Sequence, residues 1–290
     1  MGEILGRGGM GVVHAATGPA GERLAVKLVS PQLLADITAR ARFQREVRLA
    51  AGLRHPHVVA VHSGGTEGEQ PYMVMDRVDG TDLQALVAER GPLHPVWAAR
   101  IVAQVGDALD AAHELGLMHR DVKPQNVLLA AGTSEPHALL SDFGLARHEA
   151  SMSGLTATGQ FVGSVDFASP EQLQGEPVDS RTDVYALGCV LAYALTGDEP
   201  FPRARDVDKL MAHIADPPPR PSELVPGLPA ALDAVVERAM AKEPAERYAA
   251  AGDVGREAVE AAAGSPAPPP WDLPARREPP EIDRGAETVA

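Results

Sequence analysis

The apolar residues of this chain change their spacing near residue 80, and this change limits the folds that the chain can adopt. Short runs of β type lie at residues 24–29 and 72–75, with one stretch of helical spacing between them at residues 37–53. From Leu83 onward the spacing is helical. Because strands come first and helices follow, without regular alternation, the pattern predicts an α+β protein in two lobes.

The same spacing predicts where the lobes begin and end. We expect a small, strand-rich lobe with one helix at residues 1–78, whose first strand is shortened because few residues precede Gly6, and a helical lobe at residues 79–262. The main helices of the second lobe are predicted at residues 97–115, 182–195, 230–240 and 253–262. Residues 263–290 are rich in proline and poor in apolar side chains, which is the composition of a disordered tail.

Composition argues against several classes of protein. Of the 290 residues, 44% are hydrophobic, which is too many for a chain that is disordered throughout. There are 26 basic and 40 acidic side chains, and the resulting charge of −14 argues against a nucleic-acid-binding protein, which would need a basic face. Binding of a single nucleotide remains compatible with this charge, because a cationic pocket can lie inside an acidic protein.

The single cysteine and the apolar runs bear on the cellular compartment. Cys189 excludes a disulfide within the chain and lies in an apolar stretch, where we expect a small core residue. That stretch, residues 184–195, is too short to cross a bilayer, so we expect no membrane span in this chain. The first residues lack the basic start and apolar run of a signal peptide, and we therefore expect a cytoplasmic protein.

A glycine-rich segment near the start has the spacing of a phosphate-binding loop. It fits the pattern G-x-G-x-x-G-x-V, with its fixed positions at Gly6, Gly8, Gly11 and Val13. Dinucleotide-binding turns share this pattern but lead into a helix, whereas here a turn at residues 18–21 and another strand follow, which favours a β-hairpin over the phosphates. Lys27 lies at the centre of the returning strand, from which it either points inward or faces solvent.

Three further motifs follow in a fixed order. They are HRDVKPQNVL at residues 119–128, DFG at residues 142–144 and SPE at residues 169–171. Each short motif could arise by chance, but the ordered set, with a lysine and a glycine-rich segment upstream, matches the signature motifs of protein kinases. The chain resembles the eukaryotic-like serine/threonine protein kinases of bacteria over residues 1–262, especially the catalytic part of their receptor kinases.

Smaller matches support this resemblance. They are FQRE at residues 43–46, MDRV at 75–78, TDVYALG at 182–188 and KEPAERY at 242–248. Lys123 is the family's mark of the serine/threonine type. The resemblance implies a bilobal protein-kinase fold and ATP-dependent phosphorylation of Ser and Thr hydroxyls on proteins.

The resemblance also assigns catalytic roles. Phosphoryl transfer depends mainly on positioning and electrostatic stabilisation, because charge spreads over the phosphoryl oxygens in the transition state. Asp121 would orient the substrate hydroxyl and accept its proton, and Lys123 would neutralise charge on the transferred group. Lys27 would hold the α- and β-phosphates and be oriented by an ion pair with Glu46.

A metal site and a nucleotide site are implied in the same way. Asn126 and Asp142 would ligate Mg²⁺, or Mn²⁺ in its place, because hard cations prefer oxygen donors. ATP would lie under the glycine-rich segment, with Met75 as gatekeeper and backbone groups of Asp76 and Val78 bonding the adenine. The expected nucleotide contacts are Leu5, Gly6, Gly8, Gly11, Val13, Ala25, Lys27, Met75, Asp76, Val78 and Leu128.

Regulation is expected in the loop between the DFG and SPE motifs. Autophosphorylation of Thr156 or Thr158 would order the loop through charge-assisted bonds to Arg120. The alternative is that both threonines are solvated loop residues. Ser164 would contact the catalytic aspartate and lysine and favour hydroxyl substrates.

Other residues are expected to support the site. Glu171 and Arg247 would form a buried ion pair in the large lobe, Asp183 would brace the catalytic loop, and His119 would pack below Phe143. His55 and His57 have no further metal ligands nearby in the sequence and are interpreted as loop residues.

Two other functions remain open at this level. A pseudokinase that acts as a scaffold would be expected to lack at least one catalytic residue, and all are present here. A small-molecule phosphotransferase usually lacks the Lys123-Pro124 pair and the framework from the SPE motif to Arg247. The expected partners are protein substrates and a second copy of the chain in a transient dimer. The expected lack of a membrane span fits either a soluble member or a shortened receptor, and the few residues before Gly6 fit the shortened receptor.

Overall fold

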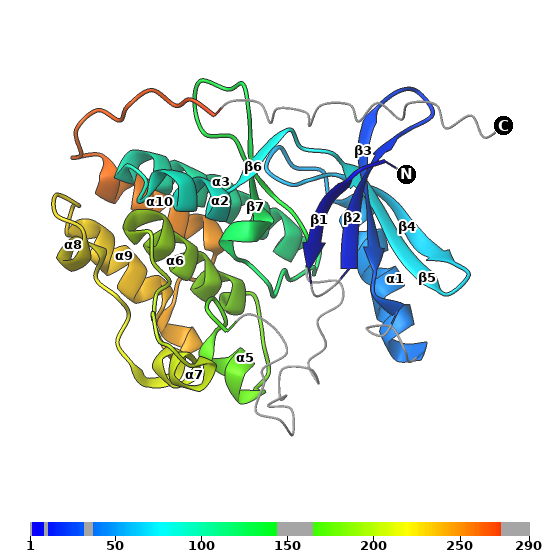
Figure 1. Cartoon of the computed structure of the whole chain (residues 1–290). Coiled ribbons are helices and arrows are strands. Elements are labelled where there is room, and N and C mark those ends of the chain that lie inside the picture. The colour runs from blue at the N-terminus through cyan, green and yellow to red at the C-terminus, as the bar shows by residue number, and fades with distance from the viewer. Residues whose placement is uncertain (1, 9–10, 32–36, 144–164, 274–290) are drawn as a thin grey trace.

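Figure 1 shows a strand-rich lobe beside a helical lobe, which confirms the predicted bilobal α+β architecture. The computed structural model describes residues 2–8, 11–31, 37–143 and 165–273. The strands are β1 (Ile4–Gly8), β2 (Gly11–Thr17), β3 (Arg23–Val29), β4 (Val61–Glu67), β5 (Gln70–Asp76), β6 (Gly80–Asp82), β7 (Val127–Ala130) and β8 (Ala138–Leu140). The helices are α1 (Ile37–Gly52), α2 (Leu83–Arg90), α3 (Pro95–Glu114), α5 (Pro170–Gln174), α6 (Arg181–Thr196), α7 (Asp206–Ala215), α8 (Pro221–Leu224), α9 (Ala231–Ala239) and α10 (Ala251–Ala262), with 3-10 turns η2 (Pro124–Asn126) and η3 (Pro244–Glu246).

The small lobe is an antiparallel sheet in the strand order β1-β2-β3-β5-β4. Alternate residues of β5 point into the core, so Met73 and Met75 are buried. Pairing extends back to Gly2, whose N–H donates to the carbonyl of Ala15 at 2.7 Å. The short first strand therefore pairs with β2 along its length.

Helix α1 lies against β4 and carries Glu46 toward the large lobe. Phe43 and Val47 are buried under the sheet. The helix approaches β4 closely at Gly64, where a Cβ would lie 2.7 Å from Cγ1 of Val47. This close packing fixes the helix against β4.

The large lobe is built around α6, which is buried along nearly its whole length. Its sequence is apolar on all sides, which is typical of a helix in the centre of a domain, and Cys189 is a buried core residue there as expected. Helix α3 packs along α10, and the two backbones meet at Gly106, where a Cβ would lie 2.6 Å from the carbonyl oxygen of Ala251. None of the helices in the described ranges combines the length and the apolar character needed to cross a membrane.

A second sheet, in the order β6-β7-β8, lies where the two lobes meet. Asp82 ends β6 and begins α2 as its N-cap, accepting a hydrogen bond from the N–H of Ala85 at 2.8 Å. The N–H of Val59 donates to the carbonyl of Leu140 at 3.0 Å and ties the small lobe to β8. This sheet positions the segments on either side of it, which hold the HRD and DFG motifs.

Residues 265–273 differ from the disordered tail that composition predicted. Trp271 and Leu273 are only 8% and 6% exposed and belong to the main apolar core. Nε1 of Trp97 donates to the carbonyl of Pro269 at 3.1 Å. Composition did not predict this packing, because the segment is mostly polar residues and prolines. Two apolar side chains, Trp271 and Leu273, are nevertheless enough to hold it against the large lobe. Residues 274–290 lie outside the described part of the chain.

A buried ion pair joins two distant parts of the large lobe. Arg247 donates to both carboxylate oxygens of Glu171 at 2.8 Å, and the two side chains are 0% and 4% exposed. The hydroxyl of Thr182 donates to the same carboxylate at 2.7 Å. The structure confirms the pair that the sequence predicted.

We expect Arg247→Ala to lower the free energy of unfolding by about 3–5 kcal/mol, because it leaves the Glu171 carboxylate buried without its cation. The control Arg256→Ala removes an exposed pair with Asp253 and should cost less than about 1 kcal/mol. Urea denaturation followed by circular dichroism measures both values. If both variants lost the same free energy of unfolding, the buried pair would contribute no more to stability than the exposed pair, which would contradict the prediction.

The same carboxylate should make the fold sensitive to acid. Burial alone would raise the pKa of Glu171, but the hydrogen bonds and charge of Arg247 outweigh it and hold the pKa below the ordinary 4.5. A lowered folded-state pKa contributes stability that is complete above pH 4.5 and is lost as the pH falls through the folded value. Urea midpoints measured from pH 7 to pH 3 should therefore fall more steeply in the unmodified chain than in Glu171→Gln.

Candidate active site

One buried carboxylate holds the catalytic loop. Asp183 is 1% exposed and accepts hydrogen bonds from the backbone N–H groups of His119 at 2.8 Å and Arg120 at 2.7 Å. Nε2 of His113 lies 2.7 Å from the same carboxylate. Burial alone would raise the pKa of Asp183, but its hydrogen bonds to His113 and to the backbone N–H of His119 hold the pKa below its ordinary value. Asp183 therefore stays ionised and braces the loop, as expected.

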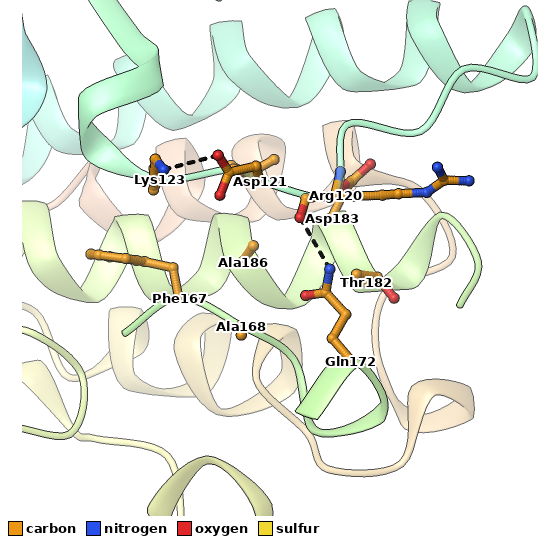
Figure 2. Close-up of a pocket in the computed structure, with 10 residues that line it drawn as sticks. Arg120, Asp121, Lys123, Phe167, Ala168, Gln172, Thr182, Asp183 and Ala186 are labelled. Carbon is orange, nitrogen blue, oxygen red and sulfur yellow. Dashed lines mark hydrogen bonds and ion pairs between the residues drawn. The ribbon is translucent and has the colours of Figure 1, made fainter. Parts of the chain in front are cut away.

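Arg120 turns the chain sharply just before the catalytic aspartate. Its backbone is left-handed, with φ at 60°, which is rare for a residue other than glycine and needs support from its surroundings. That support comes from both sides, because its N–H bonds to Asp183 and its carbonyl accepts from Nε2 of Gln172 at 3.0 Å (Figure 2). The SPE helix α5 therefore fixes the backbone next to Asp121.

The structure brings Asp121, Lys123 and Asn126 together. Nζ of Lys123 lies 2.9 Å from Oδ2 of Asp121, as Figure 2 shows. Nδ2 of Asn126 donates to the backbone carbonyl of Asp121 at 2.7 Å and to Oδ2 at 3.3 Å. Because the amide nitrogen is engaged in this way, the amide oxygen of Asn126 is left for another partner. The carboxylate of Asp121 is thus held in one orientation beside a cation.

Asp142 follows β8 in a second left-handed turn, with φ at 57°. Phe143 packs on the ring of His119 with 4.8 Å between ring centroids. Nε2 of His119 lies 2.9 Å from the carbonyl of Ser141, and burial lowers the pKa of this histidine, which stays neutral. The expected packing role of His119 is confirmed, and it fixes Ser141 and Phe143 against the catalytic loop.

Lys27 points inward and contacts Asp142. Its Nζ lies 2.8 Å from Oδ1 of Asp142, and its side chain is only 12% exposed, so it does not face solvent from an edge. Oδ1 is buried, and Lys27 is its ion-pair partner there. Together with the amide oxygen of Asn126, the Asp142 carboxylate offers the oxygen donors that Mg²⁺ prefers.

The expected ion pair between Lys27 and Glu46 is not formed. Glu46 instead lies 3.3 Å from Nη1 of Arg120, while Lys27 is engaged by Asp142. Burial raises the pKa of Glu46, although the charges of Arg120 and two arginines on α1 oppose the rise. Lys27 and Glu46 both belong to the small lobe, and each is instead neutralised by an opposite charge of the large lobe.

A cleft of about 430 Å³ lies between the lobes. Of the expected nucleotide contacts, those that line it are Leu5, Gly6, Val13, Ala25, Met75, Asp76, Val78 and Leu128. Gly8, Gly11 and Lys27 do not line it, although Asp142, the partner of Lys27, does. Gly11 has another role, because a Cβ there would lie 1.9 Å from the carbonyl oxygen of Leu28 on the neighbouring strand.

The hinge, residues 76–79, presents free backbone groups to this cleft. Val78 takes part in no backbone hydrogen bond with other described residues, whereas the N–H of Asp76 is already bonded to the carbonyl of Ala60 at 2.9 Å. The unpaired N–H and C=O of Val78 are therefore suited to bind a planar base. The N–H of Asp76 is not.

Sequence reasoning missed part of the cleft wall. The additional lining residues are Val59, Arg77, Asp79, Gly80, Thr81, Asp82, Ala85, Glu89, Arg90, Gln125, Ser141 and Leu273. Most follow the hinge, and the N-cap pattern at Asp82 was the available signal for a helix beginning there. Leu273 is far away in the chain and carried no signal.

Several expected site residues lie outside the described part of the chain. Thr156, Thr158 and Ser164 are among residues 144–164.

The histidines near residue 56 make a backbone contact. Nδ1 of His57 lies 2.9 Å from the carbonyl oxygen of Ala138. The described residues contain no group of three or more His, Cys, Asp and Glu side chains that could hold a metal. His57 thus contacts the backbone of β8.

Known proteins share both sequence and fold with this chain. Serine/threonine-protein kinase PknD of Mycobacterium tuberculosis is 48% identical over 261 residues, which are 89% of this chain and 39% of PknD. Serine/threonine-protein kinase PknH of the same organism is 45% identical over 260 residues, 89% of this chain and 41% of PknH. The chain thus spans about two fifths of the length of these curated relatives.

A solved structure, the Mycobacterium tuberculosis PknI kinase domain, matches with a TM-score of 0.71 at 35% identity, covering 89% of this chain and 94% of that chain. The protein kinase domain family, which uses ATP and a divalent metal, matches residues 1–255. These likenesses agree with the ordered motifs and with the geometry around Asp121 and Asp142. The chain therefore belongs to the protein kinase family, among the eukaryotic-like serine/threonine kinases of bacteria.

Proposed function

We propose that this chain transfers the γ-phosphoryl group of ATP to Ser and Thr hydroxyls of proteins. The observation that carries the proposal is the orientation of the Asp121 carboxylate by Lys123 and Asn126, with Asp142 and Lys27 paired at the cleft. A fixed carboxylate beside a cation is suited to orient a hydroxyl and to stabilise charge on the group that it attacks.

The remaining roles follow from the same contacts. Val78 would bind the adenine through its free backbone groups, with Leu5, Val13 and Leu128 as apolar walls. Mg²⁺ held by Asp142 and Asn126 would neutralise phosphate charge when bound. Lys27 would be the phosphate contact nearest to that site.

Two charge pairs would change partners on activation. Lys27 now contacts Asp142, and Glu46 contacts Arg120. A phosphate on Thr156 or Thr158 would compete with Glu46 for the guanidinium of Arg120, because it carries about −1.5 to −2 charges. Glu46 would then be released toward Lys27, which gives autophosphorylation a physical route to the expected Lys27–Glu46 pair.

We expect Asp121→Asn to reduce phosphoryl transfer by about 100- to 10,000-fold, because the amide cannot accept the hydroxyl proton. Transfer of radiolabelled phosphate from Mg-ATP to a generic basic protein measures the rate. The matched control Asp198→Asn changes an exposed aspartate outside the cleft and should keep the rate of the unmodified chain. Lys27→Met should also abolish transfer.

Three results of this assay would contradict the proposal. Equal transfer by Asp121→Asn and the unmodified chain would refute the role of Asp121. Nucleotide binding without any transfer would indicate a pseudokinase. Transfer to small hydroxyl compounds but to no protein would indicate a small-molecule phosphotransferase.

Autophosphorylation is tested by mass spectrometry after incubation with Mg-ATP. We expect phosphate on Thr156 or Thr158, and we expect Thr156→Val/Thr158→Val to slow transfer to the basic protein, because Arg120 then keeps Glu46. Thr66→Val, at an exposed strand position, is the matched control. An initial rate per molecule that rises with protein concentration would show the expected transient dimer. An active preparation in which neither Thr156 nor Thr158 carries phosphate would contradict activation by autophosphorylation.

A further inference from the structure

The wall of the nucleotide cleft includes a residue from the far end of the described chain. Leu273 lines the cleft together with hinge and α2 residues, although it lies almost 200 residues beyond the hinge in sequence. Its side chain is buried, and its carbonyl accepts a hydrogen bond from the N–H of Gly132 at 3.3 Å. We call residues 265–273 the strap, because they follow α10 and run over the large lobe (Figure 1). Leu273, at the end of the strap, lines the cleft.

The strap is anchored on α3 by an aromatic pair. Trp271 packs edge-on against Trp97 with 5.9 Å between ring centroids, and Nε1 of Trp97 donates to the carbonyl of Pro269. The guanidinium of Arg100 covers Trp97 at 5.1 Å. The prolines around Trp271 restrict the backbone before docking, which lowers the entropy lost when the strap packs.

The anchor places Leu273 at the hinge end of the cleft. The N–H of Ala131, next to Gly132, donates to the carbonyl of Asp79 at 2.9 Å, and Asp79 also lines the cleft. Leu273 therefore lies near the end of the hinge at Asp79, in the same cleft that Val78 lines.

We infer that Leu273 is a nucleotide-positioning residue and that docking of the strap and binding of the nucleotide stabilise each other. The inference rests on the proposed function, because it names a further contact for the same nucleotide. An apolar side chain at this place removes water from the base end of the cleft and adds contact area. Coupling between the two events is reciprocal by thermodynamic necessity.

Leu273 borders the nucleotide cleft as part of its wall and does not occupy the space that a nucleotide would fill. With the strap docked, about 430 Å³ of the cleft remains open, which lies within the roughly 300–1,000 Å³ of ordinary ligand pockets. Leu273 is only 6% exposed and packs within the main apolar core, so it borders this space without filling it. Removing its side chain should therefore weaken nucleotide binding, whereas removing a plug would strengthen it.

The test measures the affinity of the full chain for Mg-ADP by isothermal titration calorimetry. We expect Leu273→Ala to raise the Kd about three- to tenfold, because a partial loss of apolar contact amounts to at most one factor of ten. Leu224→Ala, the same change at a residue that is 61% exposed and outside the cleft, should leave the Kd within about twofold. Steady-state kinetics should show a higher KM for ATP with little change in kcat.

A second variant tests the anchor. Trp271 does not line the cleft, yet Trp271→Ala should also raise the Kd, because it releases the strap that carries Leu273. The double variant Trp271→Ala/Leu273→Ala should bind no more weakly than the weaker single variant, since both act through one unit. Thermal unfolding identifies folded variants. If Leu273→Ala does not fold, the smaller change Leu273→Val is measured in its place, and we expect it to raise the Kd for Mg-ADP about two- to threefold.

The outcomes separate this inference from the proposed function. An unchanged Kd in folded Leu273 and Trp271 variants, or tighter binding in either, would overturn the strap as a wall while the proposed kinase activity stands. A full unmodified chain that binds neither Mg-ADP nor Mg-ATP would overturn both.

Discussion

The buried carboxylate of Asp183 is the interaction on which the rest of the active site depends. It accepts the backbone N–H groups of His119 and Arg120 and contacts His113, so that its charge is compensated inside the large lobe. Without these partners an ionised carboxylate at 1% exposure would be too costly to keep. The left-handed backbone of Arg120, and through it the direction of Asp121, follows from this arrangement.

Charge inside the site is held in pairs that cross between elements. Lys27 on β3 contacts Asp142 after β8, and Arg120 in the catalytic loop contacts Glu46 on α1. Each pair joins the small lobe to the large lobe at part-buried positions, where charges are screened less than at the surface. Each of these cations thus has a carboxylate partner, which is how an acidic chain of charge −14 can hold lysines inside the site.

The cleft is lined by segments that are far apart in the sequence: the first strands, the hinge with α2, the catalytic segment from Gln125 to Asp142, and the strap. The wall along α2 was missed. The first strands, the hinge and the catalytic segment were predicted from residues, because glycine spacing, apolar runs and the HRD and DFG motifs are local patterns. The strap was not. A composition that is mostly proline and polar predicts disorder, and the packing of Trp271 on Trp97 of α3 and of Leu273 in the apolar core outweighs that tendency.

The sequence by itself determined the family, the bilobal α+β architecture and which side chains gather at Asp121, because the ordered motifs are those of the protein-kinase family. It also determined the Glu171–Arg247 pair. Tertiary structure alone decided the partners of Lys27 and Glu46 and the place of Leu273. Ion-pair choice depends on distances of a few ångströms between lobes, and packing of a segment depends on a surface formed by other elements. A local sequence pattern predicts neither the distances between charged groups of the two lobes nor the surface on which a distant segment packs.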